Sequence, residues 1–93
     1  MDKHLETQII NYMKPYEPNK IGIFGSFARN EQTDKSDIDV LVDFKKKVSF
    51  FELGKIQVEL SDLIKRNVDL VTERSMHPKL KTYILKDLKI IFG

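Results

Sequence analysis

The segment that constrains the fold most runs from Asp37 to Phe44 and begins by alternating carboxylates with apolar side chains, as Asp-Ile-Asp-Val. Successive side chains of a β-strand point to opposite faces, so this alternation predicts a strand over residues 38–44. Asp37 and Asp39 then share a face and lie roughly 6.5 to 7 Å apart. Two carboxylates are therefore directed at one point.

The rest of the chain reads as short helices and strands. Apolar residues at helical spacing predict helices over residues 3–14, 49–65 and 78–88, with a short helix over 26–29. Short β-rich runs predict strands over 20–24 and 68–71, a possible edge strand over 90–92, and a polar loop over 30–36. The residues expected to form the buried helix faces are Leu5, Ile9 and Met13, then Leu53, Ile56, Leu60, Leu63 and Ile64, then Leu80, Ile84 and Leu88. Phe50 and Phe51 begin the second long helix, and we expect one ring in the core and the other on a partner surface.

This order of elements predicts an α/β (α+β) fold, a small mixed β-sheet flanked by helices. The 93 residues, of which 41% are hydrophobic, can bury one modest core. We therefore expect a single domain over residues 1–93.

Charge and composition exclude several classes of protein. Sixteen basic and fourteen acidic residues leave a net charge of +2, and the charges do not gather into a basic stripe, so we expect no direct nucleic-acid binding. The absence of cysteine excludes disulfides and thiolate metal sites. The polar N-terminus does not fit a signal peptide, and no apolar run approaches the roughly 18 residues of a membrane span. A cytoplasmic protein without membrane association is the expectation.

A third carboxylate belongs with the first two. Asp69 interrupts the apolar run of Val68, Leu70 and Val71, where an unpaired charge is costly and where a carboxylate beside the first pair would be repelled. A divalent cation removes that conflict. Oxygen ligands without cysteine or clustered histidine favour Mg²⁺ or Mn²⁺. Asp37, Asp39 and Asp69 are thus the candidate metal ligands.

Gly25 and Ser26 form the candidate phosphate-binding turn. A strand that turns through glycine into a helix presents free backbone N–H groups to a phosphate, and Ser26 adds a hydroxyl. Ser36, directly before Asp37, is placed to offer a second hydroxyl. Arg29, one helical turn after Ser26, is expected to reach either the phosphates or one of the acidic residues.

Each of these residues also has a structural explanation. Ser26 alone is typical of a helix N-cap. Asp37 alone is typical of a turn before a strand, and Asp39 of the solvent face of an edge strand. Asp69 alone is typical of a surface position. Their combination, with the turn after one strand and acids in the next two, favours the functional interpretation.

Two stretches, Gly25-Ser26-Phe27-Ala28-Arg29-Asn30 and Ser36-Asp37-Ile38-Asp39-Val40-Leu41-Val42, resemble the signature of the DNA polymerase beta-type nucleotidyltransferase superfamily. The chain is most similar to its minimal members, the antitoxins of HEPN/MNT toxin–antitoxin pairs, over nearly its whole length. Asn30 stands where the family usually has glycine, and asparagine also tolerates the left-handed conformation that ends a helix.

The resemblance implies a nucleotidyltransferase (polymerase beta-like) fold and a role for each candidate residue. Gly25, Ser26 and Ser36 would hold the triphosphate of ATP, and Asp37 and Asp39 would bind two Mg²⁺ ions. Asp69 would complete the catalytic metal site and help to deprotonate the attacking hydroxyl.

The resemblance also implies an activity, the transfer of AMP from ATP to a tyrosine of a HEPN ribonuclease toxin, by which the chain acts as an antitoxin. Larger members add a domain that grips the acceptor, and 93 residues leave no room for one. Two alternatives remain at this point. One is a subunit that modifies a small hydroxylated molecule, as aminoglycoside nucleotidyltransferases do, and the other is a non-catalytic antitoxin that acts by binding.

Overall fold

The computed structural model describes residues 1–93 as three α-helices, two short 3-10 helices and four strands. In chain order these are α1 (Lys3–Met13), η1 (Lys14–Tyr16), β1 (Pro18–Phe24), η2 (Gly25–Phe27), β2 (Ile38–Phe44), α2 (Phe50–Ile64), β3 (Val68–Thr72), α3 (Pro78–Asp87) and β4 (Lys89–Phe92).

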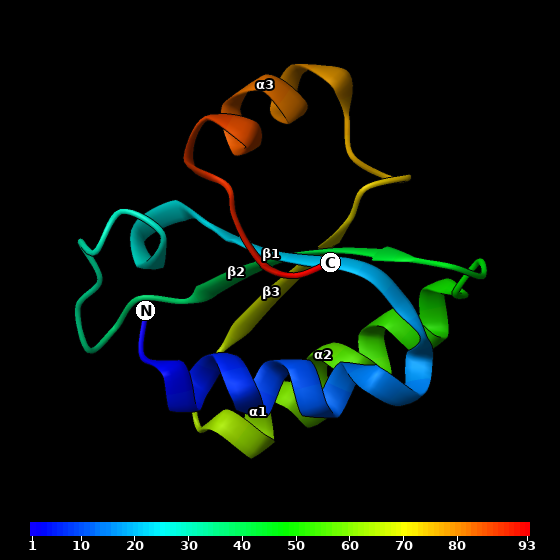
Figure 1. Cartoon of the computed structure of the whole chain (residues 1–93), viewed down its shortest axis with the longest axis horizontal. Helices are drawn as coiled ribbons and strands as arrows, with labels where there is room; N and C mark the ends of the chain where they lie inside the picture. Colours follow the sequence, from blue (N-terminus) through cyan, green and yellow to red (C-terminus); the bar gives the residue numbers. More distant parts are fainter.

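The four strands form one mixed sheet in the order β3-β2-β1-β4. β1 runs antiparallel to both β2 and β4, whereas β2 and β3 are parallel and are connected through α2. Helices α1 and α2 lie against one face of the sheet, and α3 lies over the other (Figure 1). The predicted mixed sheet flanked by helices is confirmed.

The main core lies between the sheet and the pair α1 and α2. Ile38, Val40 and Val42 of β2 alternate toward these helices and are fully buried, together with Ile56 and Leu60 of α2. The alternation leaves Asp39 on the opposite face of β2, the face over which α3 lies. The core thus orients the acidic side of the strand.

Helix α2 begins and ends at residues with clear local causes. The side chain of Ser49 caps its first turn by accepting a hydrogen bond from the backbone N–H of Glu52, at 3.2 Å. At the other end Lys65 adopts a left-handed conformation (φ 59°) that stops the helix. Only a short connection therefore separates the end of α2 from the start of β3.

Several element boundaries and exposures differ from the sequence-based expectations. β1 begins at Pro18 and not at Lys20, because a register shift between the two residues lets Pro18 pair with Phe44 at the strand end. The predicted helix over 26–29 is only the 3-10 turn η2. Leu63 and Leu80 are 46% and 55% exposed, so neither joins the core. No helix is both long and apolar enough to cross a membrane.

The expectation for the phenylalanine pair is wrong, because both rings are exposed, Phe50 by 86% and Phe51 by 89%. Phe51 points to the side of α2 opposite Leu53, since residues two apart on a helix are about 200° apart. Phe50 is the first residue of α2 and precedes the part of the helix that packs on the sheet.

Candidate functional site

The sheet brings the predicted acidic residues to one end. In the parallel pair β2 and β3, Asp39 stands directly opposite Asp69. On its other side Asp39 pairs with Phe24, the residue that precedes the Gly25 turn. Asp37 lies one residue before β2, as the strand predicted over residues 38–44 implies, and is exposed. Three aspartates and the glycine turn therefore lie at the same end of the sheet.

The pKa of Asp39 is raised by its surroundings in this cluster. Burial raises the pKa of the half-buried Asp39 carboxyl, and the negative charges of Asp69 and then Asp37 raise it further, while Arg29 acts in the opposite direction. The carboxylates thus repel one another as they lie. Asp69 itself is exposed, in contrast to the apolar environment expected from its neighbours, because its side chain points away from the buried face that holds Val68.

The three aspartates offer the type of ligand atom that a divalent cation prefers, but their carboxylates are not close enough together to bind one. Their donors are all carboxylate oxygens, which Mg²⁺ and Mn²⁺ prefer, and their mutual repulsion is what a cation would relieve. However, no group of three histidine, cysteine or acidic side chains is gathered closely enough to hold an ion as it stands. Binding would require the aspartate side chains to turn toward one another.

Any other residue at Gly25 would be strained and would displace the turn or Asp39. Its φ is +73°, and a Cβ atom built on it would lie 2.1 Å from Oδ2 of Asp39. The turn therefore passes directly over the aspartate. It continues as η2, and Asn30 ends it in the left-handed conformation (φ 58°) that the sequence predicted for asparagine. Because η2 has only three residues, a phosphate here would depend on single N–H groups and the Ser26 hydroxyl more than on a helix dipole.

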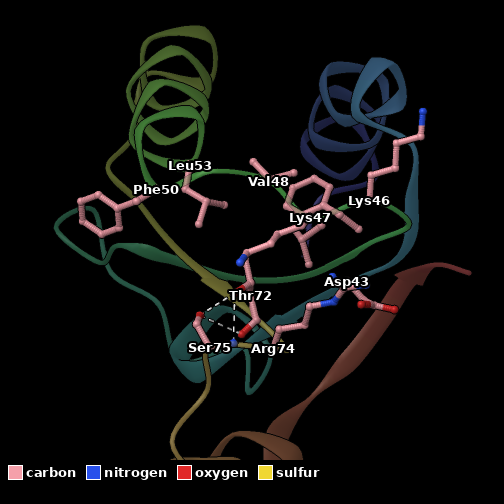
Figure 2. Close-up of a pocket in the computed structure, with 11 residues that line it drawn as sticks. Asp43, Lys46, Lys47, Val48, Phe50, Leu53, Thr72, Arg74 and Ser75 are labelled. Atoms are coloured by element: carbon pink, nitrogen blue, oxygen red, sulfur yellow. Dashed lines mark hydrogen bonds between the residues drawn. The ribbon is translucent and has the colours of Figure 1, made fainter.

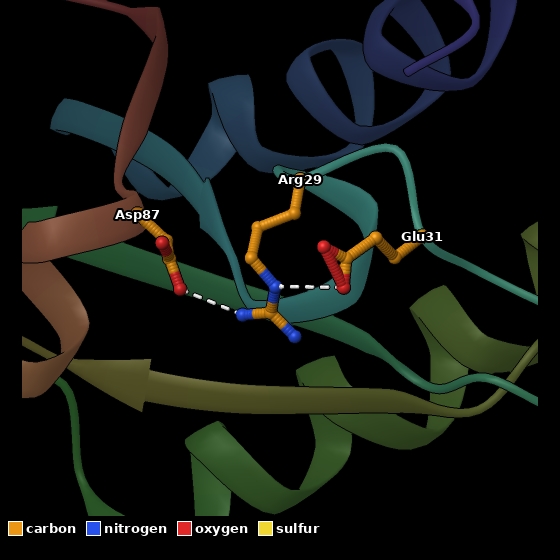
Figure 3. A network of polar contacts seen from close by, with 3 residues as sticks. All are labelled: Arg29, Glu31 and Asp87. Atoms are coloured by element: carbon orange, nitrogen blue, oxygen red, sulfur yellow. Dashed lines mark hydrogen bonds and ion pairs between the residues drawn. The ribbon is translucent and has the colours of Figure 1, made fainter.

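Arg29 bridges the turn to the last helix. Its Nη1 lies 2.6 Å from Oδ2 of Asp87, the final residue of α3, and its Nε lies 3.4 Å from Oε2 of Glu31 (Figure 3). The guanidinium therefore reaches acidic residues, one of the two outcomes expected, although its partners are not the three aspartates. The Arg29–Asp87 pair ties α3 to the segment after the glycine turn.

Ser36 has a structural contact inside its loop. Its Oγ accepts a hydrogen bond from the backbone N–H of Thr33 at 2.8 Å. This contact fixes the loop that leads into Asp37. Its role at a triphosphate stays a prediction.

Arg66 is the residue that sequence reasoning missed. Its Nη1 donates to the backbone carbonyls of Thr33, Asp34 and Ser36 at 3.2, 3.3 and 3.0 Å. Its guanidinium carbon also lies 5.1 Å from the centre of the Phe27 ring. Arg66 thus fastens the loop before Asp37 to the turn that follows Gly25. Nothing in the sequence distinguishes this arginine from an ordinary residue between a helix and a strand.

Replacing Asp39 by asparagine is expected to leave the metal-free protein at least as stable at neutral pH. The folded state binds the Asp39 proton more tightly than the unfolded chain, so the free energy of unfolding falls as pH rises from near 3.8 through the raised pKa. Asparagine does not ionise, so the variant keeps its free energy of unfolding where wild type loses part of it. Thermal melts of both proteins in EDTA between about pH 4 and 7 measure it. A variant much less stable at neutral pH would show that the carboxylate has a structural role.

A protein-family model matches most of the length of the chain. Residues 7–93 match the model of "Polymerase beta, Nucleotidyltransferase". The chain is 47% identical over 74 residues to "Putative protein adenylyltransferase MJ0126" of Methanocaldococcus jannaschii, an alignment that covers 78% of this chain and 76% of that protein. It is also 33% identical over 69 residues to "Protein adenylyltransferase MntA" of Thermococcus cleftensis, which covers 74% of this chain and 70% of the relative.

Solved structures show the same architecture. A protein in a structure described as a toxin-antitoxin with AMP-PNP superposes with a TM-score of 0.88 and 26% identity, covering 95% of this chain and 73% of that one. A structure described as "Structure of putative minimal nucleotidyltransferase" gives a TM-score of 0.79 and 25% identity, with coverage of 94% of this chain and 89% of that one. With the glycine turn and the aspartates at one end of the sheet, the chain belongs to the polymerase beta nucleotidyltransferase family.

Proposed function

We propose that this chain is a protein adenylyltransferase that transfers AMP from ATP to a tyrosine of a HEPN-domain toxin and so acts as its antitoxin. The observation that carries the proposal is the position of Asp37, Asp39 and Asp69 with the Gly25 turn at one end of the sheet. The relatives named protein adenylyltransferases support the reaction. A structural neighbour in a toxin-antitoxin complex with AMP-PNP supports ATP as donor and a toxin as partner.

The proposed reaction assigns a task to each group. The tyrosine oxygen attacks the α-phosphorus of ATP, a P–O bond forms, the bond to pyrophosphate breaks, and the tyrosine proton passes to Asp69. Gly25 lets the backbone approach the phosphates, and Ser26 and Ser36 offer hydroxyls to them. Arg29 holds the turn in place through Asp87. Two Mg²⁺ or Mn²⁺ ions held by Asp37, Asp39 and Asp69 would supply charge stabilisation at the attacking and leaving oxygens. The reaction would take place in the cytoplasm, where ATP is available.

Incubation of the wild-type chain with ATP, Mg²⁺ and a candidate HEPN-domain partner is the direct test. The expected result is a partner whose intact mass has increased by one or more AMP units, on a tyrosine located by peptide mapping. Omission of Mg²⁺ should abolish the increase. A partner that is bound and inhibited without any gain in mass would establish a binding antitoxin instead, and AMP on a small hydroxylated molecule alone would establish the aminoglycoside-like alternative.

Replacing Arg66 by lysine is expected to weaken nucleotide binding although the charge is kept. Lysine lacks the guanidinium whose Nη1 donates to three carbonyls and whose carbon lies over the Phe27 ring, so the loop before Asp37 loses its anchor. The rise in melting temperature caused by Mg²⁺ with AMP-PNP should shrink, and the metal-free protein should lose about 1–2 kcal/mol.

Arg74→Lys is the matched control, because Arg74 is exposed and makes no ion pair or hydrogen bond. It should leave both measurements unchanged. An Arg66→Lys protein with the full nucleotide-dependent rise would show that the loop is held by other contacts.

A further inference from the structure

A groove lies at the end of the sheet away from the aspartates. It has a cavity volume of about 330 Å³ and is formed by the ends of β2 and β3 and the first turn of α2 (Figure 2). We call it the distal groove and define it by Lys46, Lys47, Val48, Phe50, Leu53 and Arg74. None of these residues belongs to the catalytic set proposed above.

The distal groove is positively charged, and its cations have no partner. Lys46, Lys47 and Arg74 take part in none of the three ion pairs of the chain, which join Lys20 to Glu73 and Arg29 to Glu31 and Asp87. Asp43 is the single acidic residue in the lining, and its carboxylate accepts a hydrogen bond from Asn19 at 3.2 Å. The N-terminus of the 15-residue helix α2 adds to the positive potential.

Apolar side chains line the same groove and continue beyond it. Val48 and Leu53 lie inside, and Phe50 stands at its margin with 86% of its surface exposed. Phe51, next along α2, is 89% exposed on the outer side of the helix. Adjacent exposed aromatic rings mark surfaces that bind macromolecules. A free anion or mononucleotide in the groove would leave Phe51 in water, so the charge and the aromatic pair together fit a protein.

We propose that the distal groove docks an acidic segment of the HEPN-domain partner, one that places a large apolar side chain beside Phe50 and its carboxylates on Lys46, Lys47 and Arg74. The proposal rests on the proposed function for the identity of the partner. Asp39 and Phe44 are five residues apart on β2, so the groove lies roughly 17 Å from the aspartates. A partner held there can present a tyrosine at the other end of the sheet.

This arrangement explains how residues 1–93 would position an acceptor. Catalysis requires the attacking oxygen to be held in line, and a displacement of about 1 Å can cost roughly 10²-fold in rate. A second cavity, of about 470 Å³, lies beside the loop that leads to Asp37, but its lining, which includes Gln32, Thr33 and Arg66, is mostly polar and offers less apolar surface to an acceptor. Docking at a second, distant point supplies the missing restraint.

Binding measured without ATP or Mg²⁺ separates docking from catalysis. The double variant K46E/K47E should bind the HEPN protein about 10- to 100-fold more weakly than wild type by calorimetry at low salt, a difference that shrinks as salt screens the charges. F50A should weaken binding about 10-fold with little salt dependence. Both should keep the melting shift with Mg²⁺ and AMP-PNP, since they lie outside the nucleotide site.

The matched control is K79E/K81E, which makes the same change in charge at exposed lysines of α3 that do not line the distal groove. It should bind within about twofold of wild type. Equal losses in the two double variants, or wild-type binding by K46E/K47E, would overturn the proposal. Failure of the wild type to bind the HEPN protein would overturn it as well. Groove-dependent binding without AMP transfer would uphold the docking site and remove the catalytic proposal.

Discussion

Replacing Asp37 by asparagine is expected to reduce AMP transfer to the HEPN partner by at least about 10²-fold without harming the fold. Asp37 is exposed, lies outside β2, and its carboxylate makes no hydrogen bond or ion pair within the chain. Asparagine therefore removes no structural contact. It does remove one of the charges that would hold Mg²⁺ against the triphosphate, and that interaction matters most as negative charge shifts to the leaving pyrophosphate.

Asp34→Asn is the matched control for this substitution. Asp34 is an exposed aspartate in the same loop, three residues away, and only its backbone carbonyl is engaged, by Arg66. Intact-mass measurement of the partner over time gives the transfer rate for wild type, Asp37→Asn and Asp34→Asn. Rates within about twofold of one another would exclude Asp37 as a metal ligand. A slow Asp37→Asn enzyme that still binds the partner normally would place the loss in the chemical step.

Much of the sheet and of the acidic cluster can be predicted because the relevant signals are local. The alternation that begins at Asp37 predicts β2 at its observed bounds, Ile38–Phe44. The β-rich run around Asp69, which follows a helix, predicts a third strand, and the structure pairs this strand parallel to β2 with Asp39 opposite Asp69. These inferences need only the spacing of neighbouring residues and the geometry of a strand.

The contacts that shape the site depend instead on residues far apart in the chain. Arg29 meets Asp87 across 58 positions, and Arg66 reaches back about 30 positions to the loop before Asp37. No local pattern encodes either contact, because each exists only once the sheet has placed β3 and α3. The structure was therefore needed to find Arg66.

The wrong expectation for Phe50 and Phe51 has a different physical cause. Pattern reasoning assumes that large apolar residues are buried by the chain that carries them. Both rings are exposed at the start of α2, beside a groove whose cations are also without partners. If a second protein covers this surface, the two rings are buried by residues of another chain, and the sequence of this chain alone cannot predict that burial.

Gly25→Ala is expected to damage both stability and nucleotide binding, because two penalties coincide at this residue. The left-handed conformation (φ +73°) costs alanine about 1–2 kcal/mol relative to glycine. In addition, the new methyl group would lie 2.1 Å from Oδ2 of Asp39, so either the turn or the aspartate must move. The free energy of unfolding should fall by about 1–3 kcal/mol, and the melting shift with Mg²⁺ and AMP-PNP should disappear.

Gly54→Ala makes the same chemical change, but it is expected to raise the stability of the protein. Gly54 lies inside α2, and a Cβ atom there would have no neighbour within 4 Å. Alanine should therefore stabilise the helix by about 0.5–1 kcal/mol and leave the nucleotide-dependent shift intact. Denaturant unfolding gives the two stabilities, and thermal melts with and without Mg²⁺ and AMP-PNP give the shifts. If Gly25→Ala kept its nucleotide shift, the close approach of the turn to Asp39 would have no part in binding the triphosphate.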